Sequence, residues 1–568
     1  MFGKHFIVRT IPVKRVKMMF EQHRETLEKA LAAIAERGHW SAFPESPSPR
    51  VYGEGAAERG REAFASLLGK RFPLDQPGTG AWIGAERSPY GIDLGVTYPE
   101  PAVEELVAAA RAAMPAWRDA GPPARALTCV EIVHRINRRG FELAEAVRHT
   151  TGQAFVMAFQ AGGPHAQDRA LEAVAYGYAA MTAAADAARW EKPAKGEPLV
   201  MDKRFTVVPR GVALVIGCNT FPTWNAYPGL FASLVTGNPV IVKPHPRAVL
   251  PLAITVQVAR ETLAEAGFDP ALVSLAVEEG RGLATELATH PAVRVIDFTG
   301  STEYGEWLER NARQALVHTE KAGVNTVVVD STDSWRGMLG NLAFSLSLYS
   351  GQMCTAPQNI LVPAGGIETD EGHKSFDEVA SGLAAAVGRL LGDDAHAVEL
   401  TGALVNSDVQ ARVEAAPTLG EVVLASRAVK HPEFPDAVIR TPVIVRMDPE
   451  KTDIYGREHF GPISFLIPTG STRESLDLLR RTITARGALT ASVYSTSADV
   501  LDAAERAALD AGVNLSCNLT GGVYVNQSAA FSDYHGTGAN PAATASLTDP
   551  GYVAGRFHLV QSRRPARS

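Results

Sequence analysis

Hydrophobic side chains recur at helical spacing through the first part of this 568-residue chain. Apolar and alanine-rich positions three or four residues apart predict amphipathic helices over residues 20–37, 103–117, 123–145 and 168–188. Between the first two of these helices the sequence is rich in proline and shows little regular pattern up to about residue 99, as expected of loops. These helices are expected to serve mainly as scaffold.

From about residue 204 the pattern changes to short apolar runs that alternate with helical segments. The predicted strands are residues 204–208, 211–218, 239–242, 273–277, 293–298 and 326–329, and the predicted helices are residues 225–235 and 249–266. Such alternation is typical of a doubly wound parallel sheet, in which ligands bind beyond the carboxyl ends of the strands. A second α/β block follows from residue 331 to about 525, so the chain is expected to hold two or three packed units.

Composition excludes several classes of function. The chain has 55 Lys and Arg against 62 Asp and Glu, a net charge of −7 with both signs scattered, so it lacks the basic field that nucleic acid requires. No apolar run approaches the roughly 18 uninterrupted residues of a membrane span. Residues 1–15 are basic, but their apolar stretch is too short for a secretory signal. We therefore expect a cytoplasmic protein that binds neither nucleic acid nor membrane.

One of the four cysteines occupies a position suited to covalent chemistry. None of the four forms a CxxC pair, which favours free thiols in a reducing compartment and no metal site. Cys354 follows a helical run over residues 334–349 that Gly351 would end, so it is expected in a turn. A thiolate there could attack a substrate, although most free cysteines are small buried hydrophobes.

Polar residues follow the predicted strands at the edge where ligands gather. Asn219 comes directly after the strand 211–218, where its amide could donate to an oxyanion or simply satisfy a turn. Lys243 ends the next strand, and a cation there suits ribose or phosphate groups unless it is merely solvated. Gly300 and Ser301 join a strand to a helix, where free amides favour an anion, with an ordinary N-cap as the alternative.

Two glutamates are candidates for further roles. Glu320 lies between two strand-like runs, 354 − 320 = 34 residues before the cysteine, and is a candidate base for activating water. Glu458 and Phe460 lie in a turn ahead of a predicted strand over residues 463–467, suited to hold a sugar hydroxyl and to flank a flat ring. Most glutamates in turns are simply exposed, so Glu458 alone indicates little.

Taken in chain order, these residues resemble the motifs of the aldehyde dehydrogenase superfamily over roughly residues 100 to 560. The resembling set is Asn219, Lys243-Pro244, Phe298-Thr299-Gly300-Ser301-Thr302-Glu303, Glu320, Gly351-Gln352-Met353-Cys354-Thr355 and Glu458-His459-Phe460-Gly461-Pro462. The chain is more closely similar to the phenylacetate-degradation proteins called PaaN. That narrower resemblance rests on its long N-terminal segment, on Ser88-Pro89-Tyr90-Gly91-Ile92 and on Thr319-Glu320-Lys321-Ala322-Gly323.

The resemblance implies an α/β fold with two doubly wound domains, a β-strand oligomerisation arm and an N-terminal helical extension. On this basis residues 1–99 are the extension, residues 100–330 the cofactor-binding domain, to which residues 526–555 return, and residues 331–525 the catalytic domain. Residues 198–208 and 556–561 would be the oligomerisation strands, and a homodimer or homotetramer is expected.

The resemblance also implies roles for the candidate residues. Cys354 would add to an aldehyde, with the oxyanion held by the Asn219 side chain and the Cys354 backbone amide. Hydride would pass to a nicotinamide, and Glu320 would activate the water that hydrolyses the resulting thioester. The residues expected to hold the dinucleotide are Lys243, His245, Gly300, Ser301, Glu458 and Phe460.

Three departures from the family pattern affect these expectations. The loop after Asn219 has one extra residue, which makes Asn225 the alternative oxyanion donor. The usual Glu-Leu-Gly-Gly is Glu320-Lys321-Ala322-Gly323, which changes the lining of the nicotinamide pocket. Pro246, after His245, stands where NAD-preferring members carry a glutamate, and a protonated imidazole would attract a 2′-phosphate, so NADP is favoured over NAD.

Three functions remain open from the sequence. The first is a hydrolytic dehydrogenase acting on an aldehyde or semialdehyde, with a CoA-linked substrate from aromatic catabolism suggested only by the PaaN resemblance. The second is a CoA-acylating enzyme, against which Glu320 argues because a base for water has little use there. The third is a cofactor-binding or structural protein that keeps the fold without turnover.

Overall fold

The computed structural model describes residues 13–280, 282–544 and 546–566. Most of the segment examined for a secretory signal, residues 1–12, therefore lies outside the described residues, as does the start of the expected extension. Among the described residues, no helix combines the length and the apolar character needed to cross a membrane.

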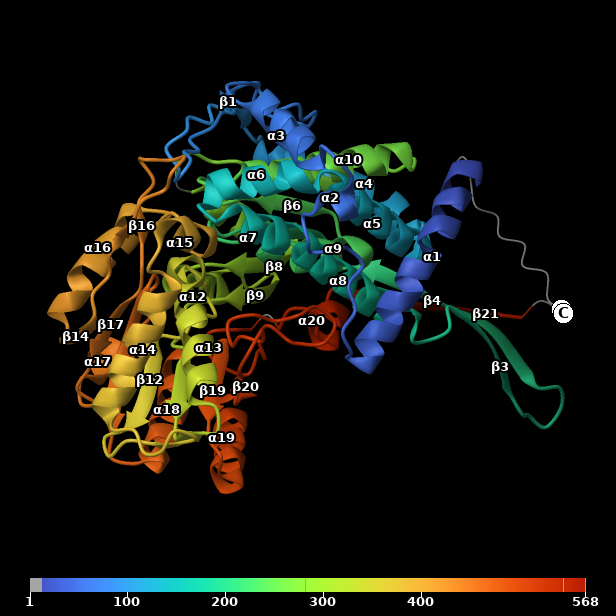
Figure 1. The fold of residues 1–568 in the computed structure, drawn as a ribbon. Coiled ribbons are helices and arrows are strands. Elements are labelled where there is room, and N and C mark those ends of the chain that lie inside the picture. The colour runs from blue at the N-terminus through green and yellow to red at the C-terminus, as the bar shows by residue number, and fades with distance from the viewer. Residues whose placement is uncertain (1–12, 281, 545, 567–568) are drawn as a thin grey trace.

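A layer of helices precedes the sheets (Figure 1). Its helices are α1 (Val13–Glu36), α2 (Pro49–Tyr52), α3 (Ala56–Leu67), α4 (Val103–Asp119), α5 (Gly121–Arg138), α6 (Gly140–Thr151), α7 (Phe155–Gln160) and α8 (Ala166–Thr182). The helix expected over residues 123–145 is two helices, because Arg139 leaves the helical conformation at φ −100° and ψ 19°. The short strands β1 (Trp82–Ile83) and β2 (Tyr98–Pro99) pair within the proline-rich segment that was expected to be loop.

A five-stranded parallel sheet forms the first α/β unit, in the order β7-β6-β5-β8-β9. Its strands are β5 (Val212–Ile216), β6 (Val240–Lys243), β7 (Val273–Leu275), β8 (Val293–Thr299) and β9 (Leu316–Glu320), and its helices are α9 (Pro222–Val235), α10 (Leu250–Glu265), α11 (Leu283–Thr289) and α12 (Thr302–Asn311). Alternate residues of β5 enter two separate cores: Ala213 and Val215 pack with α9 and α10, and Leu214 packs with α4 and α11. Both faces are covered, which explains why the strands are apolar throughout.

A seven-stranded sheet forms the second unit, in the order β14-β17-β18-β12-β10-β19-β20. Its strands are β10 (Thr326–Val329), β12 (Asn359–Pro363), β14 (Glu421–Leu424), β17 (Val443–Arg446), β18 (Ile463–Thr469), β19 (Thr490–Tyr494) and β20 (Asn514–Cys517), and only the edge strand β14 is antiparallel. Helices α13 (Trp335–Ser347) and α14 (Phe376–Leu390) cover one face, and α18 (Thr472–Arg486) and α19 (Ala498–Ala511) cover the other.

The two sheets divide between Glu320 and Thr326, a few residues before the boundary expected at residue 330. The shorter elements of the second unit are α15 (Asp394–Leu400), α16 (Ser407–Ala415), α17 (Thr452–Tyr455), β11 (Ser331–Thr332), β13 (Glu368–Thr369), β15 (Ala428–Val429) and β16 (Ile439–Arg440). The expected fold class, two doubly wound α/β domains with a strand arm and an N-terminal helical extension, is confirmed.

A three-stranded antiparallel sheet projects from the body of the molecule, as Figure 1 shows. It is made of β3 (Ala187–Lys192), β4 (Leu199–Pro209) and β21 (Phe557–Pro565). The last two match the expected oligomerisation strands, whereas β3 was expected to be the end of the helix over residues 168–188. That helix ends at Thr182, and β3 gains its backbone partners from β4 instead.

The segment after β20 contacts the first unit. It passes beside the end of β9, where the Lys321 amide donates to the Ala542 carbonyl at 2.6 Å. It then forms α20 (Pro550–Ala554), whose Tyr552 and Val553 join the core that contains α8. The return therefore places residues near the C-terminus next to Glu320.

Candidate active site

Cys354 lies in a turn that leaves the end of α13, as the sequence predicts. Between the helix and the cysteine, Tyr349 and Ser350 adopt left-handed backbone with φ of 52° and 50°. The Tyr349 hydroxyl donates to the Thr151 carbonyl, and Ser350 Oγ donates to the Gly402 carbonyl at 3.0 Å. Each left-handed residue costs roughly 1–3 kcal/mol and persists only when its surroundings impose it. The turn is therefore rigidly held.

Three reactive side chains converge beside this turn. Sγ of Cys354 lies 3.7 Å from Nε2 of His535, and the same nitrogen lies 3.2 Å from Oε1 of Glu320. Nδ2 of Asn225 donates to Oε2 of Glu320 at 3.1 Å. Glu320 is 2% exposed and His535 4% exposed, so water screens these contacts little. The two residues 34 apart in sequence, Glu320 and Cys354, meet as expected.

The protonation states of the thiol and the carboxyl are set in opposite directions. Burial, and then the charge of Glu320, raise the pKa of the Cys354 thiol well above its usual value. Burial would also raise the pKa of Glu320, but the charge and hydrogen bond of His535, together with the Asn225 amide, hold that pKa below its ordinary value. The site therefore rests as a thiol beside a carboxylate, and attack by sulfur requires a nearby proton acceptor.

The structure brings Asn225 to this site and places Asn219 elsewhere. Nδ2 of Asn219 donates to the Thr150 carbonyl at 3.2 Å, and this residue does not line the cavity that contains Cys354. Asn225 lines that cavity from the first turn of α9. The residue first expected to supply the oxyanion donor is thus directed away from the cysteine, and the alternative residue is beside it.

The expected cofactor residues lie along the carboxyl edge of the five-stranded sheet. Lys243, 5% exposed at the end of β6, forms an ion pair with Glu278. Gly300 follows β8, and its amide donates to the Glu320 carbonyl at 3.0 Å. Oγ of Ser301 accepts from the Tyr304 amide at 3.4 Å and caps α12, so the ordinary N-cap is present.

His245 does not carry the charge that the preference for NADP assumed. Burial, and then the charge of Lys243, lower the pKa of His245 to about 4. Its Nδ1 accepts from the Arg247 amide at 3.2 Å. At neutral pH the ring is therefore uncharged.

Glu458 and Phe460 approach the first unit from the second one. Burial raises the pKa of Glu458 to about 7, although the Gly323 amide donates to its carboxylate. The Phe460 carbonyl accepts from Nε of Arg412 at 3.1 Å. Glu458 also contributes its charge to the environment of Cys354, so the two lie in one region.

His535 is a residue of this site that the sequence analysis missed. It lies in the loop Tyr534-His535-Gly536-Thr537-Gly538-Ala539-Asn540, to which no function was assigned. The Trp224 ring packs edge-on against its imidazole with centroids 4.5 Å apart, which fixes the orientation of the ring. The only sequence signal is a histidine among glycines in a stretch without helix or strand pattern.

Ligand atoms of His535, Glu320 and Cys354 lie within 4.8 Å of one another, a set that zinc can bind, so the expected absence of metal stays a prediction.

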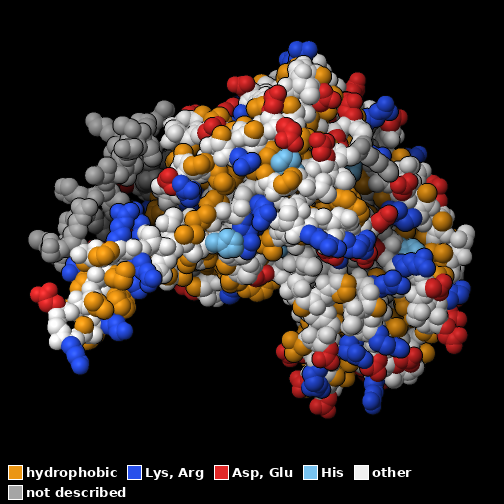
Figure 2. All heavy atoms as spheres, turned by 180° about the vertical axis from the view of Figure 1, so that it is seen from behind, with side chains coloured by type: hydrophobic (Ala, Val, Ile, Leu, Met, Phe, Trp, Pro, Cys, Tyr) orange, Lys and Arg blue, Asp and Glu red, His pale blue; other side chains and the backbone are white. Residues whose placement is uncertain are grey.

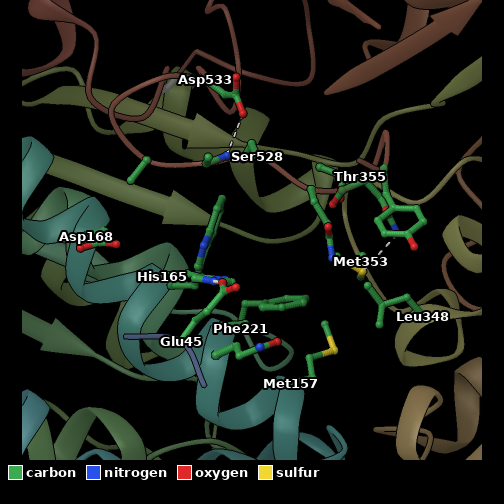
Figure 3. A pocket seen from close by; sticks show the side chains of 18 of the residues that line it. Glu45, Met157, His165, Asp168, Phe221, Leu348, Met353, Thr355, Ser528 and Asp533 are labelled. Atoms are coloured by element: carbon green, nitrogen blue, oxygen red, sulfur yellow. Dashed lines mark hydrogen bonds and ion pairs between the residues drawn. The ribbon is translucent and has the colours of Figure 1, made fainter. Parts of the chain in front are cut away.

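The thiol opens into a cavity of about 830 Å³, a volume suited to a small organic substrate. Its inner part is lined by apolar side chains, among them Phe221, Met157, Leu348 and Met353, which Figure 3 shows around the space. Residues 39–45 of the N-terminal extension line the same cavity, and Figure 3 shows Glu45 across the space from Met353 and Thr355. No pattern in the sequence indicated that contribution.

The fold and the site together define a class: α/β enzymes in which a cysteine, a carboxylate and an amide meet beside a doubly wound domain of the dinucleotide-binding type. The chain belongs to the aldehyde dehydrogenase family, whose model matches residues 97–539. The resemblance to this superfamily inferred from the motifs is thereby confirmed.

Three proteins illustrate the relationship. The chain is similar to a NAD-dependent aldehyde dehydrogenase from Burkholderia multivorans, at 58% identity over 97% of this chain and 99% of that one, with a TM-score of 0.95. It is 27% identical over 429 residues to N-succinylglutamate 5-semialdehyde dehydrogenase of Paraburkholderia xenovorans (strain LB400), covering 73% of this chain and 79% of the relative. A 1-pyrroline-5-carboxylate dehydrogenase from Thermus with bound NAD, 21% identical over 93% of this chain and 99% of that one, shares the fold at a TM-score of 0.72.

Proposed function

We propose that this protein oxidises an aldehyde to a carboxylic acid with a nicotinamide dinucleotide, through a covalent adduct on Cys354. The observation that supports it best is the convergence of the Cys354 thiol, the Glu320 carboxylate and the Asn225 amide at one cavity. Nucleophile, base and oxyanion donor are the three groups that such chemistry requires.

The residues act in sequence as follows. Sγ of Cys354 bonds to the carbonyl carbon, and its proton is lost to solvent through the cavity into which the thiol opens, because Nε2 of His535 already donates to Glu320. The Asn225 amide and the Cys354 backbone N–H donate to the oxygen that becomes negative. Loss of hydride then leaves a thioester on sulfur. Glu320 takes a proton from the water that attacks this thioester, and the acid departs as the thiol re-forms.

The residues present fit a dinucleotide. The Lys243 ammonium and the N-terminal amides of α12, next to Gly300 and Ser301, suit ribose and pyrophosphate oxygens. The Glu458 carboxylate suits ribose hydroxyls, with Phe460 beside it. When bound, the nicotinamide supplies the acceptor for hydride.

We propose NAD as the working cofactor. The earlier preference for NADP assumed a protonated His245, whose pKa of about 4 leaves it uncharged at neutral pH. The NAD-dependent relative from Burkholderia multivorans, 58% identical, supports the same choice. If the purified protein gave a higher kcat/KM with NADP than with NAD, the choice of NAD would be wrong.

The narrower resemblance to PaaN supports one particular substrate, a CoA-linked semialdehyde from phenylacetate catabolism. It leaves CoA-acylating chemistry as the competing function. Purified protein incubated with aldehyde and NAD, with and without CoA, separates the two functions. Acid formed without CoA supports hydrolysis, and product that appears only with CoA supports acylation. Cys354→Ala should abolish both reactions while dinucleotide binding, followed by fluorescence, is retained.

We also propose that the projecting sheet pairs subunits in a homodimer or homotetramer. Figure 2 shows apolar atoms on this arm, and its side chains include Leu199, Leu559 and Val560, each more than half exposed. Sedimentation of the purified protein at micromolar concentration tests the assembly.

A further inference from the structure

The outer end of the substrate cavity is built by a part of the chain that lies outside the family model. Residues 39–45, called here the N-terminal wall, line the same cavity as Cys354. The model of the aldehyde dehydrogenase family begins only at residue 97. The N-terminal extension therefore contributes directly to the space in which a substrate would lie.

The N-terminal wall is fixed in place by buried contacts. Oγ of Ser41 donates to Oδ2 of Asp168 at 2.6 Å, and the Ala42 amide donates to Oδ1 of the same carboxylate at 3.0 Å. Trp40 packs edge-on against Phe531 with ring centroids 4.8 Å apart. Phe43 is 4% exposed and packs in the core beneath the wall. A wall held by a buried carboxylate and two aromatic rings is part of the cavity shape.

The charges around the cavity are one-sided. No lysine or arginine lines it among the described residues, whereas four carboxylates do: Glu45, Asp168, Glu399 and Asp533. The other basic side chains of the lining are histidines, and two of these already face carboxylates. Nε2 of His165 lies 2.8 Å from Oε2 of Glu45, a pair that Figure 3 shows, and His535 lies beside Glu320. A carboxylate on a substrate tail would lose its water here and find no lysine or arginine among the described lining residues to replace it; Arg169, behind the lining, is already paired with Glu172.

The apolar lining indicates what the cavity accepts instead. Aromatic side chains from four separate segments surround it: Trp40, Phe43, Phe221, Trp224, Phe344 and Tyr524. Flat faces of this kind favour a bulky apolar or aromatic tail, which loses nothing on leaving water.

We propose that the cavity selects aldehydes with an uncharged, bulky apolar tail, that it discriminates against semialdehydes with a free carboxylate, and that the N-terminal wall sets this selectivity. The inference rests on the proposed function, since it names the substrate class of the same site. A carboxyl masked as a thioester is uncharged at that position and is not excluded by this argument.

Matched substrate pairs test the charge selectivity. The pairs are hexanal against 6-oxohexanoate, and benzaldehyde against 4-carboxybenzaldehyde, each with NAD at neutral pH. The expected kcat/KM is at least about 100-fold higher for the uncharged member of each pair, because an unpaired buried carboxylate is so poorly solvated. If the charged member of either pair is oxidised within about tenfold of its partner, the selectivity is absent while the proposed function stands. If no aldehyde is oxidised, the proposed function fails and this inference fails with it.

Trp40→Ala tests the contribution of the N-terminal wall. Removing the ring should lower kcat/KM for benzaldehyde by about tenfold or more and leave that for acetaldehyde, which does not reach the wall, within about twofold. Trp40→Phe should recover most of the loss. The matched control is Trp82→Ala, since Trp82 is a half-buried tryptophan of the same extension that does not line the cavity. Equal effects of the Trp40 and Trp82 variants on both aldehydes would show that the wall has only a structural role.

Discussion

Replacing Asn225 by alanine should remove the oxyanion donor, and replacing Asn219 should not. The two residues lie six positions apart, in the loop after β5 and in the first turn of α9. Nδ2 of Asn225 carries two N–H groups, and one donates to Glu320 at 3.1 Å. The amide of Asn219 is engaged by the Thr150 carbonyl at 3.2 Å. Only the first of these amides is placed to meet a charge that forms beside Cys354.

The magnitude follows from the two contacts. Loss of one oxyanion donor lowers kcat by about 10²- to 10³-fold, or roughly 2.7–4 kcal/mol. Asn225→Ala also leaves Oε2 of buried Glu320 without that partner, which should cost about 1–3 kcal/mol of unfolding free energy. Asn219→Ala removes one amide–carbonyl hydrogen bond, worth about 0.5–1.5 kcal/mol of stability, and should leave kcat within about threefold.

Rapid mixing with saturating aldehyde and NAD measures this effect directly. The first turnover of reduced cofactor reports addition and hydride loss before thioester hydrolysis, so it isolates the step at which the oxyanion forms. Asn225→Ala should slow that first turnover, and urea unfolding of each variant separates catalysis from stability. A slow first turnover in Asn219→Ala, with a normal one in Asn225→Ala, would refute the assignment of the donor.

Four further predictions address the neighbouring groups. Glu320→Gln should release one equivalent of reduced cofactor and then stall, since thioester forms but is not hydrolysed; unchanged steady-state turnover would remove this residue from the mechanism. His535→Gln should raise the pKa of Glu320 and slow steady-state turnover more than the first turnover, because the carboxylate loses the charge and hydrogen bond of the imidazole; an unchanged steady-state rate would leave the imidazole a packing role. The pKa of Glu458 is raised to about 7, so its carboxylate, which is expected to hold NAD, is lost as pH falls from about 8 to 6, and KM for NAD should rise over that interval. Glu458→Gln should abolish this pH dependence of KM. If the dependence persists in the variant, another group causes it. Asp297→Asn should cost about 3–5 kcal/mol in urea unfolding, because it leaves the fully buried guanidinium of Arg556 without its carboxylate, and a loss under 1 kcal/mol would contradict this.

The ion pair of Asp297 and Arg556 also makes the stability of the protein depend on pH, with a definite sign. Burial alone would raise the pKa of Asp297, but Arg556 lowers it below the ordinary value. A depressed carboxyl pKa contributes stability that is present above the unfolded value of about 3.9 and is lost as pH falls through the folded value. Wild-type protein should therefore lose stability under acid below about pH 4, and the Asn variant should lose less over the same interval.

The sequence predicts the strands of the first sheet well because both faces of that sheet are covered. Strands buried on both sides are continuous apolar runs, so β5, β6 and β8 are visible without any tertiary information. Residues at the ends of such strands, among them Lys243 and Glu320, follow from topology alone, since parallel strands end at a common edge.

Positions that depend on loop length or on distant contacts were harder to predict. The amide near Cys354 belongs to Asn225 and not to Asn219, and no local pattern distinguishes the two asparagines. His535 lies 181 residues from the cysteine that it contacts, in a loop without periodicity. The strand β3 resembles the end of a helix by composition and becomes a strand only because β4 pairs with it.

The site is assembled from four segments that no single domain contains. Glu320 ends a strand of the first sheet, Asn225 begins a helix of the same unit, Cys354 follows a helix of the second unit, and His535 lies on the C-terminal return. The hydrogen bond between Glu320 and His535 therefore couples the return segment to the edge of the first sheet, while the thiol approaches from the opposite unit. Because the pKa of Cys354 responds to the charge of Glu320 across this junction, the reactivity of the thiol depends on how the two units are docked. Any change that alters this docking should affect the chemistry before it affects either fold.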